Sequence, residues 1–355
     1  MPADRRPRRY DEDDVRIRPN RHGSRPRTKE RPSHSDAVQA FVVAVDRGRS
    51  TCLVGAGNLG ALGPDAPGAR LVTAMRAREL GRQKVVVGDL VALVGDVSGQ
   101  PDALARIVRI EERRSVLRRT ADDTDPVERV VVANADQLVL VTAVADPEPR
   151  PRLVDRCLVA AYDAGMTPLL CLTKADLRPP EEVLSTWAPL GLEAVSTSRR
   201  EAAEGAQIAG LDELRARLTG RVSVLVGHSG VGKSTLVNAL VPSARRATGR
   251  VNDVTGRGRH TSTSAAALAL EGGGWVIDTP GIRSFGLAHV DPERVLLAFP
   301  DLVPATADCP RGCTHDEPEC GLDGFVEAGG AGAAGPVRLV SLRRLLRARS
   351  SESGD

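Results

Sequence analysis

The chain has 355 residues, enough for two or three domains with substantial cores, and 41% of them are hydrophobic, as in globular proteins. The net charge of +3 is too small to identify a partner, and aromatic residues make up only 2%, so the cores must consist of Val, Leu, Ile and Ala. We find neither a run of eighteen apolar residues nor the apolar core of a signal peptide, so we expect a cytoplasmic protein without membrane contact.

Residues 1–36 contain many arginines and polar residues and almost nothing apolar. Such a segment buries too little apolar surface to fold, so we predict a disordered basic and polar tail. We favour a solubilising extension over a nucleic-acid-binding arm.

Residues 37–115 show short β-rich runs separated by turn signals, namely 37–55, 84–96 and 103–113, with a Gly-rich loop over 55–69. Two of these runs contain a central turn, so we predict five strands that form an OB-like β-barrel. Phe41 is the only aromatic residue of this segment, which excludes a base-stacking platform. The segment contains many arginines, including Arg76, Arg78, Arg82, Arg106, Arg109, Arg113 and Arg114. They suit phosphate contacts on a folded RNA, which we favour over the alternative of a solvated basic face.

Residues 116–290 alternate between apolar runs and segments with helical spacing, which predicts an α/β domain with a parallel sheet. The expected strands are 130–144, 167–177, 192–198 and 221–227, and the expected helices are 151–165 and 210–220. Residues 291–355 are expected to be mostly helical, interrupted by a cysteine cluster and by the Gly/Ala-rich stretch 328–335.

A phosphate-binding loop is predicted where a β-rich run meets a helical segment. Its residues are Gly227, His228, Ser229, Gly230, Val231, Gly232, Lys233 and Ser234, followed by Thr235. The glycines let backbone N–H groups turn toward phosphates, Lys233 reaches the outer phosphates, and the Ser234 hydroxyl holds Mg²⁺. Farther along, Asp278 is expected to hold the metal through water and Gly281 to offer its N–H to the last phosphate. Thr261 or Thr263 completes the Mg²⁺ shell, and the sequence leaves both open.

A base-reading motif is predicted at Thr173, Lys174, Ala175 and Asp176, directly after a buried strand. The Asp176 carboxylate can accept hydrogen bonds from both N1–H and the 2-amino group of guanine, so it selects GTP over ATP. The Lys174 stem can cover the base, and the N–H of Ser196 or its neighbours can reach the guanine oxygen.

The base motif precedes the phosphate loop, the reverse of the usual order in GTPases. Loops at the carboxyl ends of parallel strands need spatial closeness and not sequence order, so a circular permutation leaves the site intact. With an OB-like barrel, GHSGVGKST, GRHTST, DTPGIRSFG and a Cys/His cluster, this order resembles the ribosome small subunit-dependent GTPase A family (RsgA/YjeQ) over roughly residues 38–325. One departure is Thr173, where Asn is usual in GTPases. The other is the metal motif, whose first and last gaps are each one residue shorter than in the family.

His260 is the candidate catalytic residue. Many GTPases orient the attacking water with a Gln after the D-x-x-G motif, but Ile282 occupies that position here. The His260 imidazole could accept a proton from water, and the resemblance points to the same switch histidine. The alternative is a surface histidine beside two arginines.

Three cysteines and one histidine, Cys309, Cys313, His315 and Cys320, form a cluster. Cys₃His is a common closed zinc shell, so we predict one structural zinc ion, with a chance cluster of reduced thiols as the alternative. The isolated Cys52, Cys157 and Cys171 are expected to be buried core residues.

These motifs predict a GTP hydrolase that binds GTP and GDP, and the resemblance implies the small (30S) ribosomal subunit and its rRNA as partners, late in subunit assembly. Hydrolysis would time release of the protein, which we expect to be a monomer. The alternative is an RNA-binding assembly protein whose nucleotide site is a weakly hydrolytic sensor. A P-loop kinase would lack the guanine motif.

Overall fold

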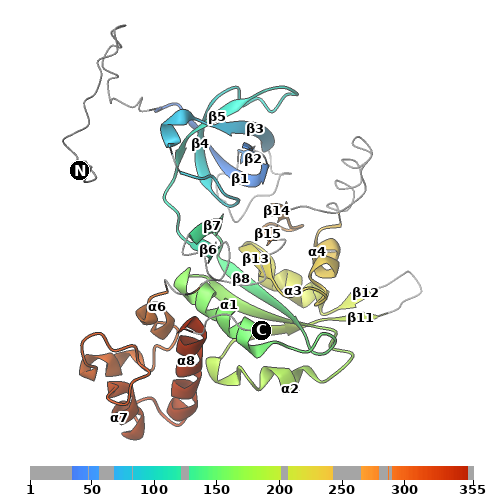
Figure 1. The fold of residues 1–355 in the computed structure, drawn as a ribbon. Coiled ribbons are helices and arrows are strands. Elements are labelled where there is room, and N and C mark those ends of the chain that lie inside the picture. The colour runs from blue at the N-terminus through green and yellow to red at the C-terminus, as the bar shows by residue number, and fades with distance from the viewer. Residues whose placement is uncertain are drawn as a thin grey trace, which may run out of the picture. The chain divides into compact units, whose positions relative to one another are not determined.

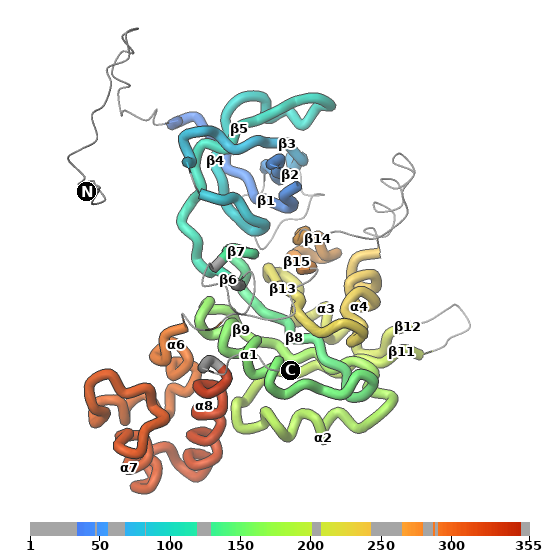
Figure 2. Tube along the Cα trace, viewed as in Figure 1, coloured from blue at the N-terminus to red at the C-terminus, as the bar shows by residue number. Residues whose placement is uncertain are grey.

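The computed structural model describes residues 34–46, 48–55, 68–81, 83–120, 128–200, 207–242, 265–279, 287 and 290–350. The described residues from 36 onward belong to one compact unit, and the predicted tail lies almost entirely outside the described residues. Figures 1 and 2 show the course of the chain through its strands and helices. No helix in the described ranges is both long enough and apolar enough to cross a membrane.

The predicted five-stranded barrel is present near the N-terminus. Its strands are β1 (Val38–Asp46), β2 (Arg49–Val54), β3 (Arg70–Arg76), β4 (Leu90–Gly95) and β5 (Ala105–Ile110). They pair in the order β1-β2-β3-β5-β4, and pairing between β1 and β4 closes the ring. Among the paired strands of the barrel, only β3 and β5 run parallel to each other. Alternate residues such as Val42, Cys52 and Ile107 fill the interior, which follows from the period of two along each strand.

The barrel differs from the sequence prediction around residues 84–87. A strand was expected there, but only Val87 pairs, in a single bridge to Val132, while the unpredicted β3 takes a place in the barrel. The buried Asp89 carboxylate accepts from the Val86 N–H and pairs with Arg113 at 2.7 Å. These side-chain bonds hold the segment before Gly88 in an irregular course.

A six-stranded sheet forms the centre of the following domain. Its strands β8 (Gln137–Ala143), β9 (Thr167–Thr173), β10 (Glu193–Ser196), β13 (Val222–Val226) and β15 (Trp275–Asp278) run parallel in the order β10-β9-β8-β13-β15. The antiparallel β14 (Ala266–Ala269) follows at the β15 side and pairs with β1 of the barrel between Ala44 and Ala266.

Helices cover both faces of this sheet (Figure 1). On β8, Leu138 and Leu140 share a core with α1 (Pro151–Asp163), whereas Val139 and Val141 share one with α3 (Leu211–Leu218) and α4 (Lys233–Leu240). The continuous apolar runs of the sequence therefore correspond to strands buried on both faces, as the parallel-sheet prediction requires.

The apolar run 130–144 is not the single strand that the sequence predicts. It divides into β7 (Glu128–Ala133), which pairs with β6 (Val116–Thr120), and β8 of the central sheet. Asn134 separates them with a φ of 55°, and its buried side chain accepts from the Arg114 N–H and donates to the Gly88 carbonyl. The change of sheet thus occurs within the three residues 134–136, where the Asn134 side chain fixes the turn.

Two further connections were not predicted from the sequence. Helix α2 (Pro180–Leu184) and the 3₁₀ turn η3 (Ala188–Leu190) join β9 to β10. The short strands β11 (Ser198–Arg200) and β12 (Gln207–Ala209) form a separate antiparallel pair.

The C-terminal region is helical, as predicted, with α6 (Pro292–Leu296), η4 (Val303–Asp308), α7 (Gly321–Glu327) and α8 (Gly335–Ser350). Helix α8 lies against α1 and the α2–η3 connection. Its Arg344 is 3.0 Å from the buried Asp155 carboxylate of α1 and donates to the Thr186 carbonyl. Its Arg338 pairs with Asp301 at 2.6 Å and donates to the Pro189 carbonyl.

Candidate nucleotide-binding and metal-binding sites

The predicted nucleotide-binding residues come from the same edge of the central sheet. Strands β8, β9, β10, β13 and β15 are parallel, so their carboxyl ends meet at one edge. The base motif follows β9, the phosphate loop follows β13, and Asp278 ends β15. This edge is where ligands bind in open α/β sheets.

The phosphate loop has the backbone that its glycines allow. Gly230 and Gly232 have φ values of 84° and 93°, which other residues rarely adopt. A Cβ on Gly227 would lie 2.4 Å from the Val141 carbonyl oxygen, so no side chain fits there. Helix α4 begins at Lys233, and the exposed Ser234 and Thr235 occupy its first turn. The N-terminal N–H groups of this helix can therefore meet an anion.

The Lys233 ammonium group forms an ion pair with the Asp278 carboxylate. The two side chains are only 15% and 26% exposed, so the pair lies in partly desolvated surroundings. The loop lysine and the carboxylate at the end of β15 are thus within reach of one ligand. Beside them, His228 Nδ1 lies 2.7 Å from the Ser229 carbonyl oxygen.

Thr173 connects the base motif to the phosphate loop. Its buried hydroxyl donates to the Val231 carbonyl at 2.5 Å and lies 3.4 Å from the Thr142 carbonyl. No local pattern predicts this contact, because Val231 lies 58 positions later in the chain. The residue that departs from the usual Asn still joins the two halves of the site.

The rest of the base motif is shaped by the chain around it. Lys174 has a φ of 55° and donates to the Asp146 carbonyl, while Asp176 is exposed at the sheet edge. The Ala175 N–H donates to the carbonyl of Thr197, and the N–H of this buried threonine donates to Leu172. Thr197 therefore holds the turn after β10 beside the base motif, and the half-buried Ser196 precedes it.

Several predicted residues lie outside the described ranges, namely His260, Thr261, Thr263, Gly281 and Ile282. Their expected roles in catalysis, Mg²⁺ binding and phosphate contact therefore stay predictions.

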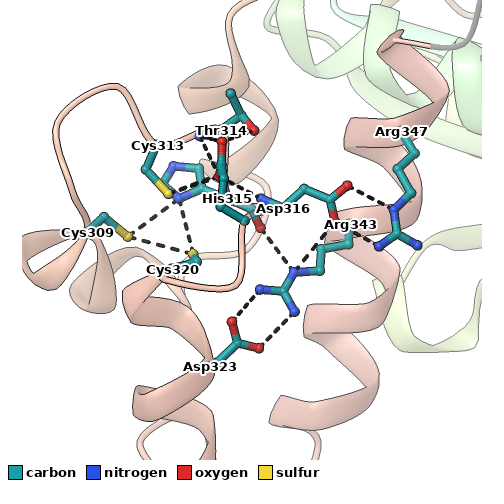
Figure 3. Close-up of polar contacts among 10 residues, drawn as sticks. Cys309, Cys313, Thr314, His315, Asp316, Cys320, Asp323, Arg343 and Arg347 are labelled. Atoms are coloured by element: carbon teal, nitrogen blue, oxygen red, sulfur yellow. Dashed lines mark hydrogen bonds and ion pairs between the residues drawn. The ribbon is translucent and has the colours of Figure 1, made fainter.

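The four predicted metal ligands do come together. One ligand atom from each of Cys309, Cys313, His315 and Cys320 lies within 4.8 Å of the others. Figure 3 shows the three thiols and the imidazole facing one another. Cys309 follows η4 and Cys320 precedes α7, so two short helical segments fix the ends of the loop that carries the ligands.

The distances fit a tetrahedral ion. Bonds of ~2.3 Å to sulfur and ~2.0–2.1 Å to nitrogen place neighbouring sulfurs ~3.8 Å apart and sulfur ~3.5 Å from nitrogen. The Cys309 and Cys320 sulfurs are 3.8 Å apart, and the Cys309 sulfur is 3.6 Å from His315 Nδ1. The gaps that are shorter than in the family therefore still permit one ion to contact all four residues.

Two thiols of this cluster, those of Cys313 and Cys320, need a cation to ionise at neutral pH. Burial raises the pKa of the Cys313 thiol to about 12 and also raises the pKa of Cys320. A bound metal ion would deprotonate such thiols at neutral pH. Burial likewise raises the pKa of Cys52, Cys157 and Cys171 to about 12, and these three are buried and unpaired, as predicted.

Polar side chains around the cluster hold its loop. Arg343 of α8 donates to the His315 carbonyl and forms a two-pronged ion pair with Asp323 of α7 (Figure 3). Within the loop, hydrogen bonds from Thr314 lower the pKa of Glu317 to about 2, so Glu317 is ionised and closes the turn. The structure thus attaches the metal loop to α8.

The phosphate loop and the base motif lie at the ends of parallel strands of one sheet, and the base motif comes first in the chain. Together with the five-stranded barrel that precedes them, they define a circularly permuted P-loop GTPase fold. The family model described as RsgA GTPase matches residues 110–288, half of the chain. The chain therefore belongs to the RsgA GTPase family and is a GTP hydrolase.

Curated relatives agree with this membership. The chain is 38% identical over 269 residues to the small ribosomal subunit biogenesis GTPase RsgA of Chlorobaculum parvum, covering 73% of this chain and 85% of the relative. It is 44% identical over 227 residues to the protein of the same name from Azotobacter vinelandii, covering 61% of this chain and 62% of the relative.

Solved structures have the same fold. YjeQ from Thermotoga maritima matches with a TM-score of 0.60 and 25% identity, covering 89% of this chain and 99% of that one. YloQ, described as a circularly permuted GTPase, matches with a TM-score of 0.59 and 22% identity over 92% of this chain and 99% of that one.

Proposed function

We propose that this GTPase binds the small ribosomal subunit late in its biogenesis and hydrolyses GTP to time its own release. The names of the curated relatives support the role on the small subunit. The observation that supports nucleotide binding is the hydrogen bond between Thr173 of the base motif and Val231 of the phosphate loop. A rigid link between the base motif and the phosphate loop suits a protein whose nucleotide must be bound in one orientation. We expect a cytoplasmic monomer.

The nucleotide would lie along the edge where β9, β13 and β15 end. Asp176 would accept from the guanine edge, and the exposed position of this carboxylate leaves it available to a base. Lys233 would exchange its partner Asp278 for the outer phosphates, which carry more charge than one carboxylate. The released Asp278 and the Ser234 hydroxyl would then hold Mg²⁺, which neutralises charge that develops on the phosphates.

Hydrolysis would depend on His260, which would accept a proton from the attacking water, with Gly281 as a phosphate contact. Thr261 or Thr263 would complete the Mg²⁺ shell.

The Cys₃His cluster would hold one structural zinc ion. Its four protein ligands leave no open position for substrate, which argues against a catalytic role. The binding of zinc would order the loop from Cys309 to Cys320 between η4 and α7.

The barrel would contribute contacts to rRNA phosphates. Its arginines are not equivalent, because Arg113 is tied to the buried Asp89 and Arg109 to Glu111. Arg78 and Arg106 are exposed, and we find no ion pair to either within the described ranges. These two side chains are therefore better RNA contacts than Arg113.

Turnover of GTP by the purified chain, with and without 30S subunits, tests the proposal. We expect slow turnover alone and a large stimulation by 30S but not by 50S subunits. Fast turnover without subunits, or equal stimulation by both subunits, would contradict it.

A further inference from the structure

The imidazole of His315 has two differently placed nitrogens. Nδ1 lies 3.6 Å from the Cys309 sulfur and 3.9 Å from the Cys320 sulfur, on the side of the metal cluster. Nε2 is 3.5 Å from a carboxylate oxygen of Glu293 in α6. The residue is only 1% exposed, and Nε2 has no hydrogen bond of standard geometry among the described residues. A buried N–H group needs a hydrogen-bond acceptor, and the Glu293 carboxylate is close enough to accept from an N–H at Nε2.

The distances around the ring assign the two nitrogens. A sulfur-to-nitrogen distance of ~3.5 Å is expected when both atoms bind one tetrahedral zinc ion, and the Cys309 sulfur lies 3.6 Å from Nδ1. Only the tautomer with its proton on Nε2 leaves the Nδ1 lone pair free for a metal ion. In that tautomer the Nε2–H group faces Glu293.

We propose that His315 binds the metal ion through Nδ1 and that Glu293 accepts a hydrogen bond from its Nε2–H, making Glu293 a positioning residue of the metal site. The carboxylate fixes the tautomer and the orientation of the ring and makes the imidazole more basic, so the bound metal is held more tightly. This inference concerns the metal site alone and stands independently of the proposed role on the ribosome.

The backbone of Glu293 is well held, although its side chain is 63% exposed. The side chain of Asp291 accepts from the Glu293 N–H, which caps the first turn of α6. The next residue, Arg294, donates to the Asp163 carbonyl at the end of α1, and Val295 is buried. Helix α6 can therefore present the carboxylate at a fixed place.

His315 would then be held from two sides. Arg343 of α8 donates to the main-chain carbonyl of His315 at 3.1 Å, and Glu293 of α6 would accept from the Nε2–H of its ring. Both helices pack against α1 of the GTPase domain. The metal ligand would thus be oriented by elements outside the loop that carries it.

A zinc-competition titration of the full chain against a chromogenic chelator tests the role of Glu293. We expect Glu293→Ala to raise the apparent Kd for zinc about 10- to 100-fold, the usual effect of losing an outer-shell partner. Glu293→Gln should have a smaller effect, because the amide oxygen can still accept from Nε2–H. The matched control is Glu319→Gln, which removes the same charge from an exposed residue next to Cys320 and should leave the Kd unchanged.

Nitrogen-15 NMR of the zinc-loaded wild-type chain tests the assignment without any variant at Glu293. The His315 signals, identified by their loss in His315→Asn, should show a metal-bound Nδ1 and a protonated Nε2. Circular dichroism of each metal-loaded variant checks that it is folded. A metal-bound Nε2 would overturn the whole proposal, and equal zinc affinity of Glu293→Ala and the wild type would overturn the role of Glu293.

Discussion

At the scale of single residues, Thr173 replaces the usual Asn of the base motif and contacts the phosphate loop. Its hydroxyl donates to the Val231 carbonyl inside the phosphate loop. We expect Thr173→Val, which keeps the shape but removes the donor, to leave this carbonyl without its partner. Such a loss costs about 1–2 kcal/mol, so the Kd for a fluorescent GTP analogue should rise roughly 5- to 30-fold.

Thr173→Ser is the control for that measurement, because it retains the hydroxyl. We expect it to bind the analogue nearly as well as the wild type. Equal affinity of the Val and Ser variants would show that the hydrogen bond does not contribute to nucleotide binding.

Asp176 carries the base preference that we predict. Asp176→Asn exchanges a carboxylate acceptor for an amide donor, so GTP affinity should fall while xanthosine triphosphate, whose 2-position carries an oxygen, should bind better than GTP. Competition between the two nucleotides measures this exchange. Asp146→Asn removes the same charge from the neighbouring exposed side chain and should keep the preference for GTP. An unchanged preference in Asp176→Asn would place the base elsewhere.

At the scale of elements, α8 fastens the C-terminal region through charged pairs. Hydrogen bonds from Arg338 hold the pKa of Asp301 below its usual 3.8. Since the pKa is lower in the folded than in the unfolded chain, the pair stabilises the fold above about pH 4 and loses this effect as the pH falls through the folded value. The melting temperatures of wild type and Arg338→Met should therefore differ at pH 6 and converge toward pH 3. A difference that does not depend on pH would assign the role of Arg338 to its packing on Phe299 and its bond to the Pro189 carbonyl.

Removal of the metal should affect one region more than the rest. In Cys313→Ala we expect the zinc content to fall from about one ion per chain toward zero, because three ligands hold zinc much less tightly than four. Proteolysis should then cut between Cys309 and Cys320, while the central sheet stays protected. A metal-free chain with unchanged melting and proteolysis would contradict a structural metal.

The sequence predicts elements best where one signal determines them. The strands before the phosphate loop and the base motif are continuous apolar runs, and the structure has β13 and β9 there. The division of residues 130–144 depends on the side chain of Asn134, which bonds to Gly88 and Arg114, and no local pattern reveals partners so distant in sequence. Strand β3 was missed because its outward residues include the apolar Leu71 and Met75, which obscure the expected alternation with polar residues.

The candidate site shows the same limit. The spacing of the four metal ligands was enough to predict their cluster, because all four lie within one short loop. The sequence does not predict the contacts of Glu293 and Arg343 with His315, because each residue comes from a separate helix more than twenty positions away. The sequence singles out Ser196 and its neighbours, but it does not predict the backbone bonds that Thr197 makes to Ala175 of the base motif and to Leu172 of β9, because backbone groups carry no sequence signature.

At the scale of the whole molecule, catalysis and partner binding should separate in one variant. His260→Ala should keep GTP binding, which we assign to Lys233, Ser234 and Asp176, and should keep binding to the 30S subunit. It should lose most of the stimulated turnover, about 10²-fold if His260 acts as a general base. Rapid turnover assays at saturating subunits measure this loss. Full stimulation of the variant would leave the GTPase assignment intact and move the catalytic group elsewhere.

The strand order also governs what a growing polypeptide can do during its own synthesis. Strand β9, one neighbour of β8 in the sheet, follows β8 closely in the chain. The other neighbour of β8, strand β13, follows only after residues 144–221. Until then the open edge of β8 could pair with a wrong strand. Asp136 favours the correct pairing with β13. Its N–H donates to the Val222 carbonyl, and its carboxylate accepts from the Val222 N–H. The half that carries the base motif is therefore translated before the half that carries the phosphate loop. The buried Asp155, which accepts from the Trp187 ring N–H, gains its ion-pair partner Arg344 only when α8 has emerged.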